Sequence, residues 1–191
     1  GVKPRAESVG TRNPLVELAI LDGGRLHTGP WPSPVGELLT RGPQVFAGYV
    51  DKKQTEEAFR DGWLRTGDAG YMDKDGYLYI HDRIKDMIIS GGFNVYPKEI
   101  ESEIDAMPGV IESAVIGVPH ADFGEGVTAV LVCSKGADVS EAAVLKALDG
   151  RLAKFKMPKR VFVVDELPRN AMGKVQKNIL RDKYKDIYSK A

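Results

Sequence analysis

The sequence predicts an α+β protein in two parts that join near Lys85. Residues 1–84 contain short apolar runs separated by Gly, Pro and Asp turn signals, a pattern typical of strands. Residues 85–191 alternate helical and strand patterns instead, which favours a compact mixed unit. Where the pattern changes, a charged cluster, a short apolar strand, the pair Gly91-Gly92 and a helix start follow one another. We therefore expect a junction between two units at this run.

The first part is predicted to consist of strands and tight turns. Asp22-Gly23-Gly24 is a turn signal after an apolar run. Asp73–Gly76 is another, and the alternating residues on both sides of it predict a β-hairpin. We expect one short helix before the turn at Asp61-Gly62. The elements predicted in this part are strands at 15–20, 36–40, 69–72 and 77–81 and the helix at 54–59.

The second part is predicted to alternate strands and helices. Ile100, Ile104 and Met107 have helical spacing, and Pro97 suits the first position of that helix. A second helix is expected after a serine N-cap, because apolar residues line one side of the segment that follows it. The predicted elements are strands at 87–89, 110–118, 127–133 and 160–164, a loop at 119–126, and helices at 97–107, from the N-cap Ser140 to Leu152, and at 178–188.

The composition is that of an ordinary globular protein. Apolar residues make up 42% and charged residues 28%, which suffices for a packed core. The 27 basic and 27 acidic residues cancel, so no global field favours nucleic acid or an anionic membrane. The single cysteine, Cys133, cannot form an internal disulfide, and no apolar run reaches the length of a membrane span. A single cysteine suits a reducing compartment, so we expect a cytoplasmic protein. Because the chain starts without methionine, we also expect it to be a fragment of a longer protein.

Three motifs in fixed order resemble those of one superfamily. They are Gly62–Asp68, Asp82–Glu101 and Leu167–Lys174. Together they resemble the C-terminal portion of the adenylate-forming enzymes, which include acyl-CoA synthetases, luciferases and peptide-synthetase adenylation domains. Residues 94–188 are most similar to malonyl-CoA synthetases, whereas the residues before the second motif are more similar to general fatty-acid or aromatic-acid CoA ligases. The resemblance implies that 1–84 is the last β-rich part of a large N-terminal domain, and that 85–191 is a small mobile C-terminal domain.

Lys174 is the candidate catalytic residue. Its local sequence alone favours a solvated lysine near a helix start, because it follows a loop that contains Pro, Asn and Gly. In the family the matching lysine bridges the carboxylate substrate and the α-phosphate of ATP, so the resemblance implies that Lys174 stabilises the charge that builds on phosphorus. The adjacent Gly173 does not make a Walker loop, because Pro168 and Val175 stand where Gly and Ser or Thr are required.

Asp68 and Arg83 are the candidate ribose ligands. A carboxylate can accept hydrogen bonds from two neighbouring hydroxyl groups, as the ribose of ATP or AMP offers them. The resemblance implies this role for Asp68, with Arg83 as its partner. The residues alone leave two alternatives open: an Asp-capped turn at Asp68, and a surface ion pair of Arg83 with Asp82 or Asp86.

Lys85 is the candidate hinge residue, and Gly91 and Gly92 are candidate contacts of CoA. The resemblance implies that the backbone of Lys85 absorbs a domain rotation. The rotation would first present Lys174 for adenylation and then bring Gly91 and Gly92 to the active site. There the two glycines would line the tunnel for the pantetheine arm of CoA, because a side chain would block it. An ordinary turn before a helix is the alternative for both glycines.

A stretch of basic residues can meet the nucleotide phosphates of CoA. A solvated helix end explains the same stretch equally well, because lysines are favoured in C-terminal turns. The three histidines lack the spacing of metal ligands, so we expect no protein metal site and assign Mg²⁺ to the phosphates of ATP. The candidate phosphate contacts are Arg151, Lys154 and Lys156.

The resemblance implies the C-terminal part of an ATP-dependent carboxylic acid–CoA ligase of fatty-acid or related metabolism. The carboxylate would attack the α-phosphorus of ATP to give acyl-AMP and pyrophosphate, and the CoA thiol would then displace AMP. The substrates would be ATP with Mg²⁺, CoA and a small carboxylic acid, whether malonate, a fatty acid or an aromatic acid. The large N-terminal domain would be the partner of this region. A non-catalytic docking unit and an adenylation domain that loads a carrier protein remain as alternatives.

Overall fold

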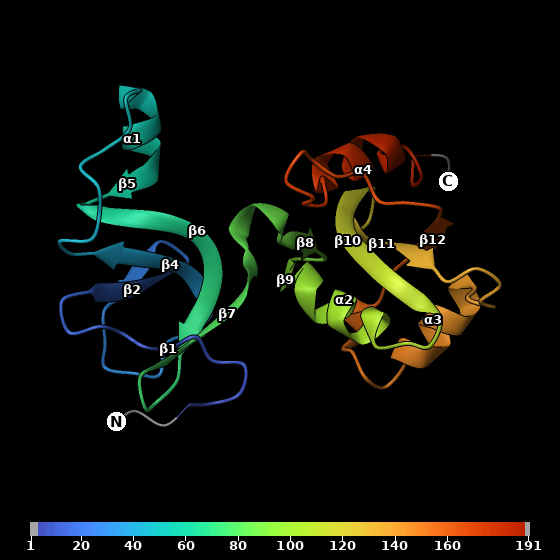
Figure 1. Cartoon of the computed structure of the whole chain (residues 1–191), viewed down its shortest axis with the longest axis horizontal. Coiled ribbons are helices and arrows are strands. Elements are labelled where there is room, and N and C mark those ends of the chain that lie inside the picture. Colours follow the sequence, from blue (N-terminus) through green and yellow to red (C-terminus); the bar gives the residue numbers. More distant parts are fainter. Residues whose placement is uncertain (1–3, 190–191) are drawn as a thin grey trace. The chain divides into compact units, whose positions relative to one another are not determined.

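The structure, a computed structural model, describes residues 4–189 and divides the chain into two compact units (Figure 1). The boundary falls between Lys85 and Asp86. Each unit has its own sheet and its own apolar clusters. The combination of sheets and helices confirms the predicted α+β class. That residues 1–84 end a larger domain stays a prediction.

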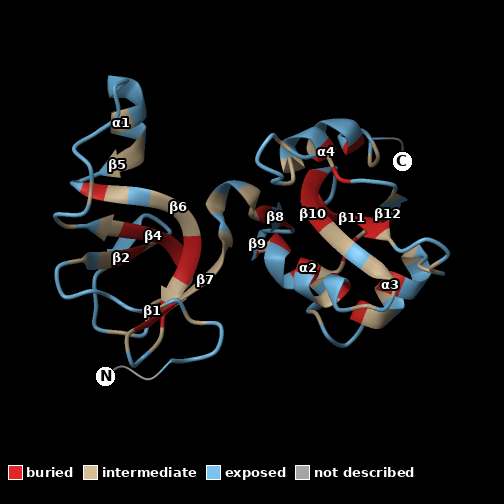
Figure 2. Cartoon of the chain, viewed as in Figure 1, coloured by how far each residue is buried: buried red, intermediate tan, exposed pale blue. Residues whose placement is uncertain are grey.

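Unit 1 contains a seven-stranded antiparallel sheet and one α-helix. The elements are β1 (Gly10–Thr11), β2 (Glu17–Asp22), β3 (Arg25–His27), β4 (Gly36–Arg41), α1 (Lys52–Ala58), β5 (Phe59–Arg60), β6 (Trp63–Met72) and β7 (Tyr77–Arg83). The strand order is β1-β7-β6-β4-β2-β3, and β5 pairs with β6. Apolar side chains from β2, β4, β6 and β7 form the core, which Figure 2 shows as buried segments of the sheet.

The local signals place most of unit 1 correctly. The predicted hairpin is confirmed, because β6 and β7 pair across the turn that begins at Asp73. The short helix begins at Lys52 rather than at residue 54, because the side chain of Asp51 accepts a hydrogen bond from Lys53 N–H and caps it. Strand β6 is longer than predicted and begins at Trp63, since the glycine-containing motif before residue 69 pairs with β4 instead of forming a loop.

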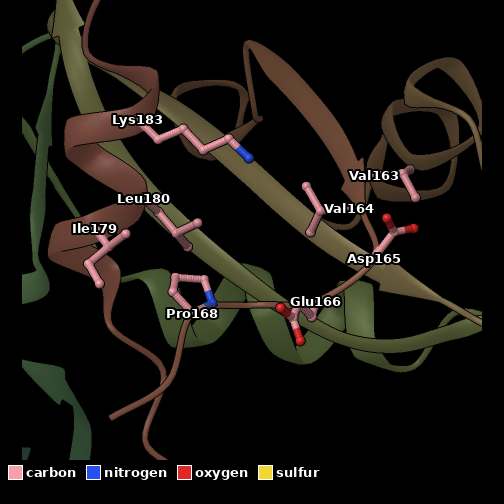
Figure 3. A pocket seen from close by; sticks show the side chains of 8 residues that line it. All are labelled: Val163, Val164, Asp165, Glu166, Pro168, Ile179, Leu180 and Lys183. Atoms are coloured by element: carbon pink, nitrogen blue, oxygen red, sulfur yellow. The ribbon is translucent and has the colours of Figure 1, made fainter.

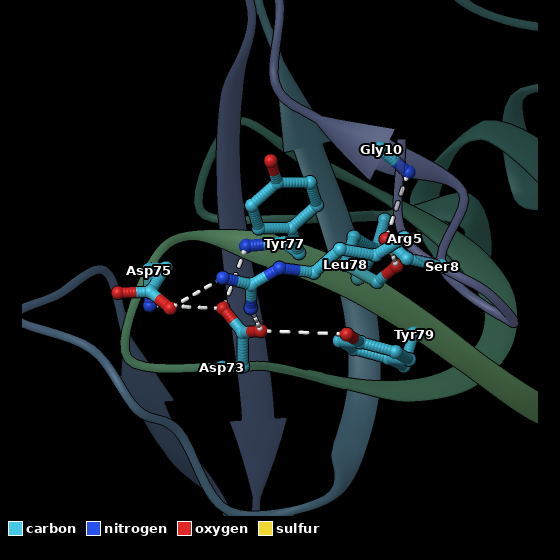
Figure 4. A network of polar contacts seen from close by, with 8 residues as sticks. All are labelled: Arg5, Ser8, Gly10, Asp73, Asp75, Tyr77, Leu78 and Tyr79. Carbon is cyan, nitrogen blue, oxygen red and sulfur yellow. Dashed lines mark hydrogen bonds and ion pairs between the residues drawn. The ribbon is translucent and has the colours of Figure 1, made fainter. Parts of the chain in front are cut away.

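The turn between β6 and β7 also holds the start of the described chain (Figure 4). Arg5 binds Asp73 at 2.5 Å and Asp75 at 2.6 Å, and its guanidinium lies 4.2 Å from the centre of the Tyr77 ring. Desolvation would raise the pKa of Asp73, but hydrogen bonds from the Tyr77 and Asp75 backbones and the charge of Arg5 together lower that pKa below its ordinary value. The turn is therefore fixed both by hydrogen bonds of its own backbone and by Arg5, which is far from it in the sequence.

Unit 2 contains a five-stranded mixed sheet with helices on both faces (Figure 1). The strands are β8 (Ile88–Ser90), β9 (Phe93–Val95), β10 (Val110–His120), β11 (Gly124–Cys133) and β12 (Arg160–Val164). The helices are α2 (Pro97–Asp105), α3 (Glu141–Leu148) and α4 (Lys177–Tyr184), with 3₁₀ turns η1 (Ile84–Asp86) and η2 (Lys154–Lys156). The strand order is β10-β11-β8-β9, and β12 pairs with β11 in parallel.

Alternating side chains of β10 and β11 bury both faces of this sheet. Val115 on β10 packs in one cluster with residues of α2 and α3, whereas its neighbour Ile116 packs in the other with residues of α4. Figure 2 shows buried segments on both strands, and the buried segment of β10 lies mostly in its second half. Because each face is covered, the sheet is a rigid base for the loops that leave it.

Several predictions in the second part are wrong at their ends. The helix predicted at 97–107 ends at Asp105. The loop expected at 119–126 is short, because β10 and β11 remain paired up to His120 and Gly124. Pro119 is tolerated there since β10 is an edge strand, which is hydrogen-bonded to a neighbouring strand on one side only among the described residues. Helix α3 ends at Leu148 and not at Leu152, since Gly150 follows with a φ of 75°.

The closing helix is also shorter than the predicted 178–188. Helix α4 ends at Tyr184, and the chain then turns so that Tyr188 reaches β11. The Tyr188 hydroxyl lies 2.9 Å from the hydroxyl of Thr128, and a Cβ on Gly126 would lie 2.5 Å from the Tyr188 ring. This close packing needs a glycine at position 126. Among the described residues, no helix is long and apolar enough to cross a membrane.

Candidate functional site

Lys174 lies at the end of a small hairpin loop between β12 and α4. Arg169 and Val175 form an isolated antiparallel bridge, and Gln176 N–H donates to Pro168 C=O at 2.7 Å. The backbone between them reverses direction over a few residues. These contacts hold the two ends of the loop together. The loop therefore has a defined structure, and its sequence does not indicate a mobile segment.

Asn170 fixes the tip of this loop. Its backbone N–H donates to Lys174 C=O, and its side-chain oxygen accepts from Met172 N–H at 3.0 Å and from Lys174 N–H at 2.9 Å. Gly173 follows with a φ of 77°, a conformation that favours glycine. Both backbone polar groups of Lys174 are thus paired with Asn170. Its side chain is exposed and has no hydrogen bond or ion pair with any residue the structure describes.

Sequence reasoning did not identify the residues that support this loop. Asn170 has a local signal, because asparagine side chains commonly bond their own backbone in turns. Arg169 and Glu112 have none, since the ion pair between them joins residues 57 positions apart. This contact becomes visible only when the fold brings β10 beside the loop.

Asp68 and Arg83 are brought together directly in unit 1. They are register partners on β6 and β7, and Arg83 Nη1 lies 2.9 Å from Asp68 Oδ1. Thr66 holds the segment, since its hydroxyl accepts from Asp68 N–H and donates to Leu38 C=O. Gly67 has a φ of 72°, and a Cβ there would lie 3.4 Å from the Arg83 guanidinium. The carboxylate remains partly open to solvent, with 30% of the side chain exposed.

Gly91 and Gly92 form the turn of the β8–β9 hairpin. Their φ values are 58° and 81°, so both positions require a left-handed backbone. Gly91 N–H donates to Phe123 C=O at 2.8 Å, and a Cβ on Gly91 would lie 3.5 Å from the Phe123 ring. Gly92 is exposed and has open space where a Cβ would be. Turn geometry alone therefore accounts for both glycines, and any contact with CoA would be an additional reason.

Lys85 is exposed in η1, at the boundary of the two units. The next residue, Asp86, is anchored within unit 2, because its carboxylate binds Arg181 on α4 at 2.8 Å. The side chains of this pair are 15% and 31% exposed. Asp86, the first residue of unit 2, is therefore fixed to that unit. A rotation between the units would change backbone torsions at Lys85 or at the residues before it.

The basic stretch lies beside α2 and the glycine hairpin. Arg151 binds Glu103 at 2.8 Å, and Lys156 binds both carboxylate oxygens of Glu99 at 2.7 Å. The side chain of Lys154 is exposed and has no such partner among residues 4–189. The Phe93 and Phe155 rings stack at 4.6 Å, which brings η2 next to the hairpin of Gly91 and Gly92. Two predicted phosphate contacts are thus neutralised within unit 2, and one is free.

A shallow pocket of about 650 Å³ opens between α4 and the end of β12 (Figure 3). Its lining contains none of the predicted site residues, although Pro168 at the base of the Lys174 loop forms part of one wall. Within the described part of the chain, no group of three or more His, Cys, Asp or Glu side chains is placed to hold a metal ion. The pocket is lined by Val163, Val164, Asp165, Glu166, Pro168, Ile179, Leu180 and Lys183.

Comparison with known proteins shows what this chain is similar to. Residues 99–174 match the AMP-binding enzyme C-terminal domain. The long-chain-fatty-acid–CoA ligase FadD13 of Mycobacterium tuberculosis is 47% identical over 150 residues, which are 78% of this chain and 30% of that protein. The indoleacetate–CoA ligase of Aromatoleum aromaticum is 43% identical over 180 residues, which are 93% of this chain and 34% of that protein.

A solved structure is similar as well. The crystal structure of ATP-bound MatB from Rhodopseudomonas palustris has 59% sequence identity and a TM-score of 0.86, covering 95% of this chain and 36% of that chain. The chain therefore spans about a third of the length of the proteins it matches. Fold, motifs and relatives agree: the chain is similar to the C-terminal region of adenylate-forming enzymes such as MatB, and its residues 99–174 match the AMP-binding enzyme C-terminal domain.

Proposed function

We propose that this chain is the C-terminal part of an ATP-dependent carboxylic acid–CoA ligase. The observation that carries the proposal is the presentation of Lys174. A region that matches the AMP-binding enzyme C-terminal domain holds an exposed ammonium group, unpaired among residues 4–189, on a loop with a fixed backbone. A cation in that arrangement suits transition-state stabilisation, because its position is set before the reaction begins.

Lys174 serves the first half-reaction. A carboxylate oxygen of the acid attacks the α-phosphorus of ATP, the bond to pyrophosphate breaks, and acyl-AMP forms. Negative charge on the phosphoryl oxygens grows during this step, and the Lys174 ammonium stabilises it more strongly than it stabilises bound ATP. Asp68 accepts hydrogen bonds from the ribose hydroxyls, and its partner Arg83 holds the carboxylate in place.

The glycine hairpin serves the second half-reaction. The CoA thiol loses its proton and attacks the acyl carbon, and AMP leaves. We assign the pantetheine arm to the surface at Gly91 and Gly92, and the CoA phosphates to Lys154, Arg151 and Lys156. For Arg151 and Lys156 this requires an exchange of their glutamate partners for phosphate, whereas Lys154 is available directly. Rotation at Lys85 connects the two half-reactions.

We assign the acid substrate only to the class of carboxylic acids. The relatives named above act, by their names, on long-chain fatty acids and on indoleacetate. Both are nevertheless 43–47% identical to this chain over the aligned residues. This region therefore carries chemistry that ligases for different acids share, and acid specificity belongs elsewhere. Malonate is the first acid to test, because residues 94–188 resemble malonyl-CoA synthetases. Mg²⁺ would be held chiefly by the phosphates of ATP.

The test is an assay of the complete ligase that carries this region, with malonate, a long-chain fatty acid and an aromatic acid. We expect acid-dependent release of pyrophosphate from ATP, followed by formation of a CoA thioester. Transfer to a carrier protein in place of CoA would favour the adenylation-domain alternative. Absence of pyrophosphate release with every acid would favour a non-catalytic docking unit. The chain on its own should show little turnover, since it spans about a third of its relatives.

A further inference from the structure

The guanidinium group of Arg169 connects the Lys174 loop to the central sheet of unit 2. Arg169 Nη1 donates to Gly173 C=O at 2.5 Å, and Nη2 binds the carboxylate of Glu112. Gly173 directly precedes Lys174, so the guanidinium binds the peptide group that joins these two residues. An arginine is suited to this arrangement, because its planar fork donates to two acceptors at once.

Glu112 gives this contact a rigid base. It lies on β10, which is paired with β11 along its length and packed by helices on both faces of the sheet. The β10–β11 register shifts beside Glu112, between Val110 and Glu112. The side chains of Glu112 and Arg169 are 29% and 43% exposed, so the pair is partly shielded from solvent. Salt screening therefore weakens it less than it weakens a fully exposed pair.

We infer that Arg169, held by Glu112, is a positioning residue for Lys174 during adenylation. This inference rests on the proposed role of Lys174. Asn170 fixes the tip of the loop internally, and Arg169 fixes the tip relative to the sheet. Without the guanidinium the loop keeps its turn but loses the ion pair that links it to Glu112 on β10. The ammonium group of Lys174 then samples a wider range of positions, and fewer of them suit the transition state.

The experiment measures both half-reactions in the complete ligase. We expect Arg169→Met to slow acyl-AMP formation about ten-fold or more, since small displacements of a catalytic group cost this much or more. Thioester formation from supplied acyl-AMP should change less than about two-fold. Arg169→Lys should recover part of the loss, and Glu112→Gln should cost less than Arg169→Met because the amide oxygen still accepts a hydrogen bond. Arg41→Met, which removes an exposed arginine–glutamate pair in unit 1, is the control.

A double variant separates positioning from direct action. If Arg169 acts through Lys174, then Arg169→Met should cause no further loss of adenylation in a Lys174→Ala background. The same fold-loss in both backgrounds would overturn the inference, because Arg169 would then act on substrate by itself. Equal losses in the two half-reactions, or no loss, would overturn it as well. If Lys174→Ala alone leaves adenylation unchanged, the proposed role of Lys174 fails, whatever Arg169→Met does.

Discussion

At the scale of single residues, Lys174 combines a fixed backbone with an exposed side chain. Its backbone N–H and C=O are both bound by Asn170, whereas its side chain is exposed and unpaired among residues 4–189. A mobile surface lysine normally loses conformational entropy when it binds an anion. Here only the side chain remains to be ordered. This is the arrangement expected of a group that acts in the transition state.

Lys174→Ala in the complete ligase tests this directly. The rate of acyl-AMP formation should fall by about 10²–10³, the usual effect of removing one preorganised charge from a transition state. Thioester formation from supplied acyl-AMP should be nearly unchanged. Lys135→Ala, at an exposed turn after β11, is the matched control and should leave both rates unchanged. A similar decrease in both half-reactions would mean that Lys174 supports the fold.

A second residue-scale prediction concerns a buried ion pair. Glu101 on α2 is 7% exposed, accepts a hydrogen bond from Val115 N–H at 2.9 Å, and binds Lys177 at the start of α4 at 2.7 Å. Lys177→Met would leave the Glu101 carboxylate buried without its cation. We expect the free energy of unfolding to fall by about 3 kcal/mol, since breaking a buried pair from one side is costly.

Urea denaturation of the chain, followed by circular dichroism, measures this change. Both tryptophans, Trp31 and Trp63, lie in unit 1, so tryptophan fluorescence follows that unit separately. The loss should appear in the dichroism transition. Arg160→Met breaks an exposed pair with Glu141 and should cost less than about 1 kcal/mol. An equal effect of the two substitutions would contradict the view that burial makes the Glu101 pair important.

At the scale of elements, the glycine hairpin has two explanations that one pair of variants separates. Turn geometry requires a positive φ at Gly92, which asparagine adopts more readily than alanine. Gly92→Ala should therefore destabilise the chain by about 1 kcal/mol, and Gly92→Asn by less. If the open surface also admits the pantetheine arm, Gly92→Asn should slow thioester formation about ten-fold or more while adenylation is spared. Normal thioester formation by a stable Gly92→Asn variant would leave the turn as the sole reason for the glycine.

The elements also show what a sequence can and cannot predict. Strand β12 and the hairpin at Asp73 follow from local patterns, and both are confirmed by the structure. The end of β10 depends on its place at the edge of the sheet, which no local signal at Pro119 reveals. The candidate site residues came from motifs along the chain. The contacts that support them, such as Arg169 with Glu112, join residues far apart in sequence and leave no periodic signal.

At the scale of the whole molecule, the boundary at Lys85 is where two independently stabilised units meet in sequence. Each unit has its own core, and Asp86 is already anchored to α4 through Arg181. A large conformational change therefore needs to alter few backbone torsions. The proposed alternation between half-reactions assigns that change to the backbone of Lys85, with no chemical role for its side chain.

Substitution of Lys85 in the complete ligase separates a backbone role from a side-chain role. Lys85→Ala leaves the backbone free, so both half-reactions should stay within about two-fold of the parent rates. Lys85→Pro fixes φ near −65° and restricts the preceding residue, so one domain orientation should be favoured permanently. One half-reaction should then fall by about 10²-fold or more, while the other is retained. A loss in Lys85→Ala that matches the loss in Lys85→Pro would assign the function to the ammonium group and would remove the hinge from the mechanism.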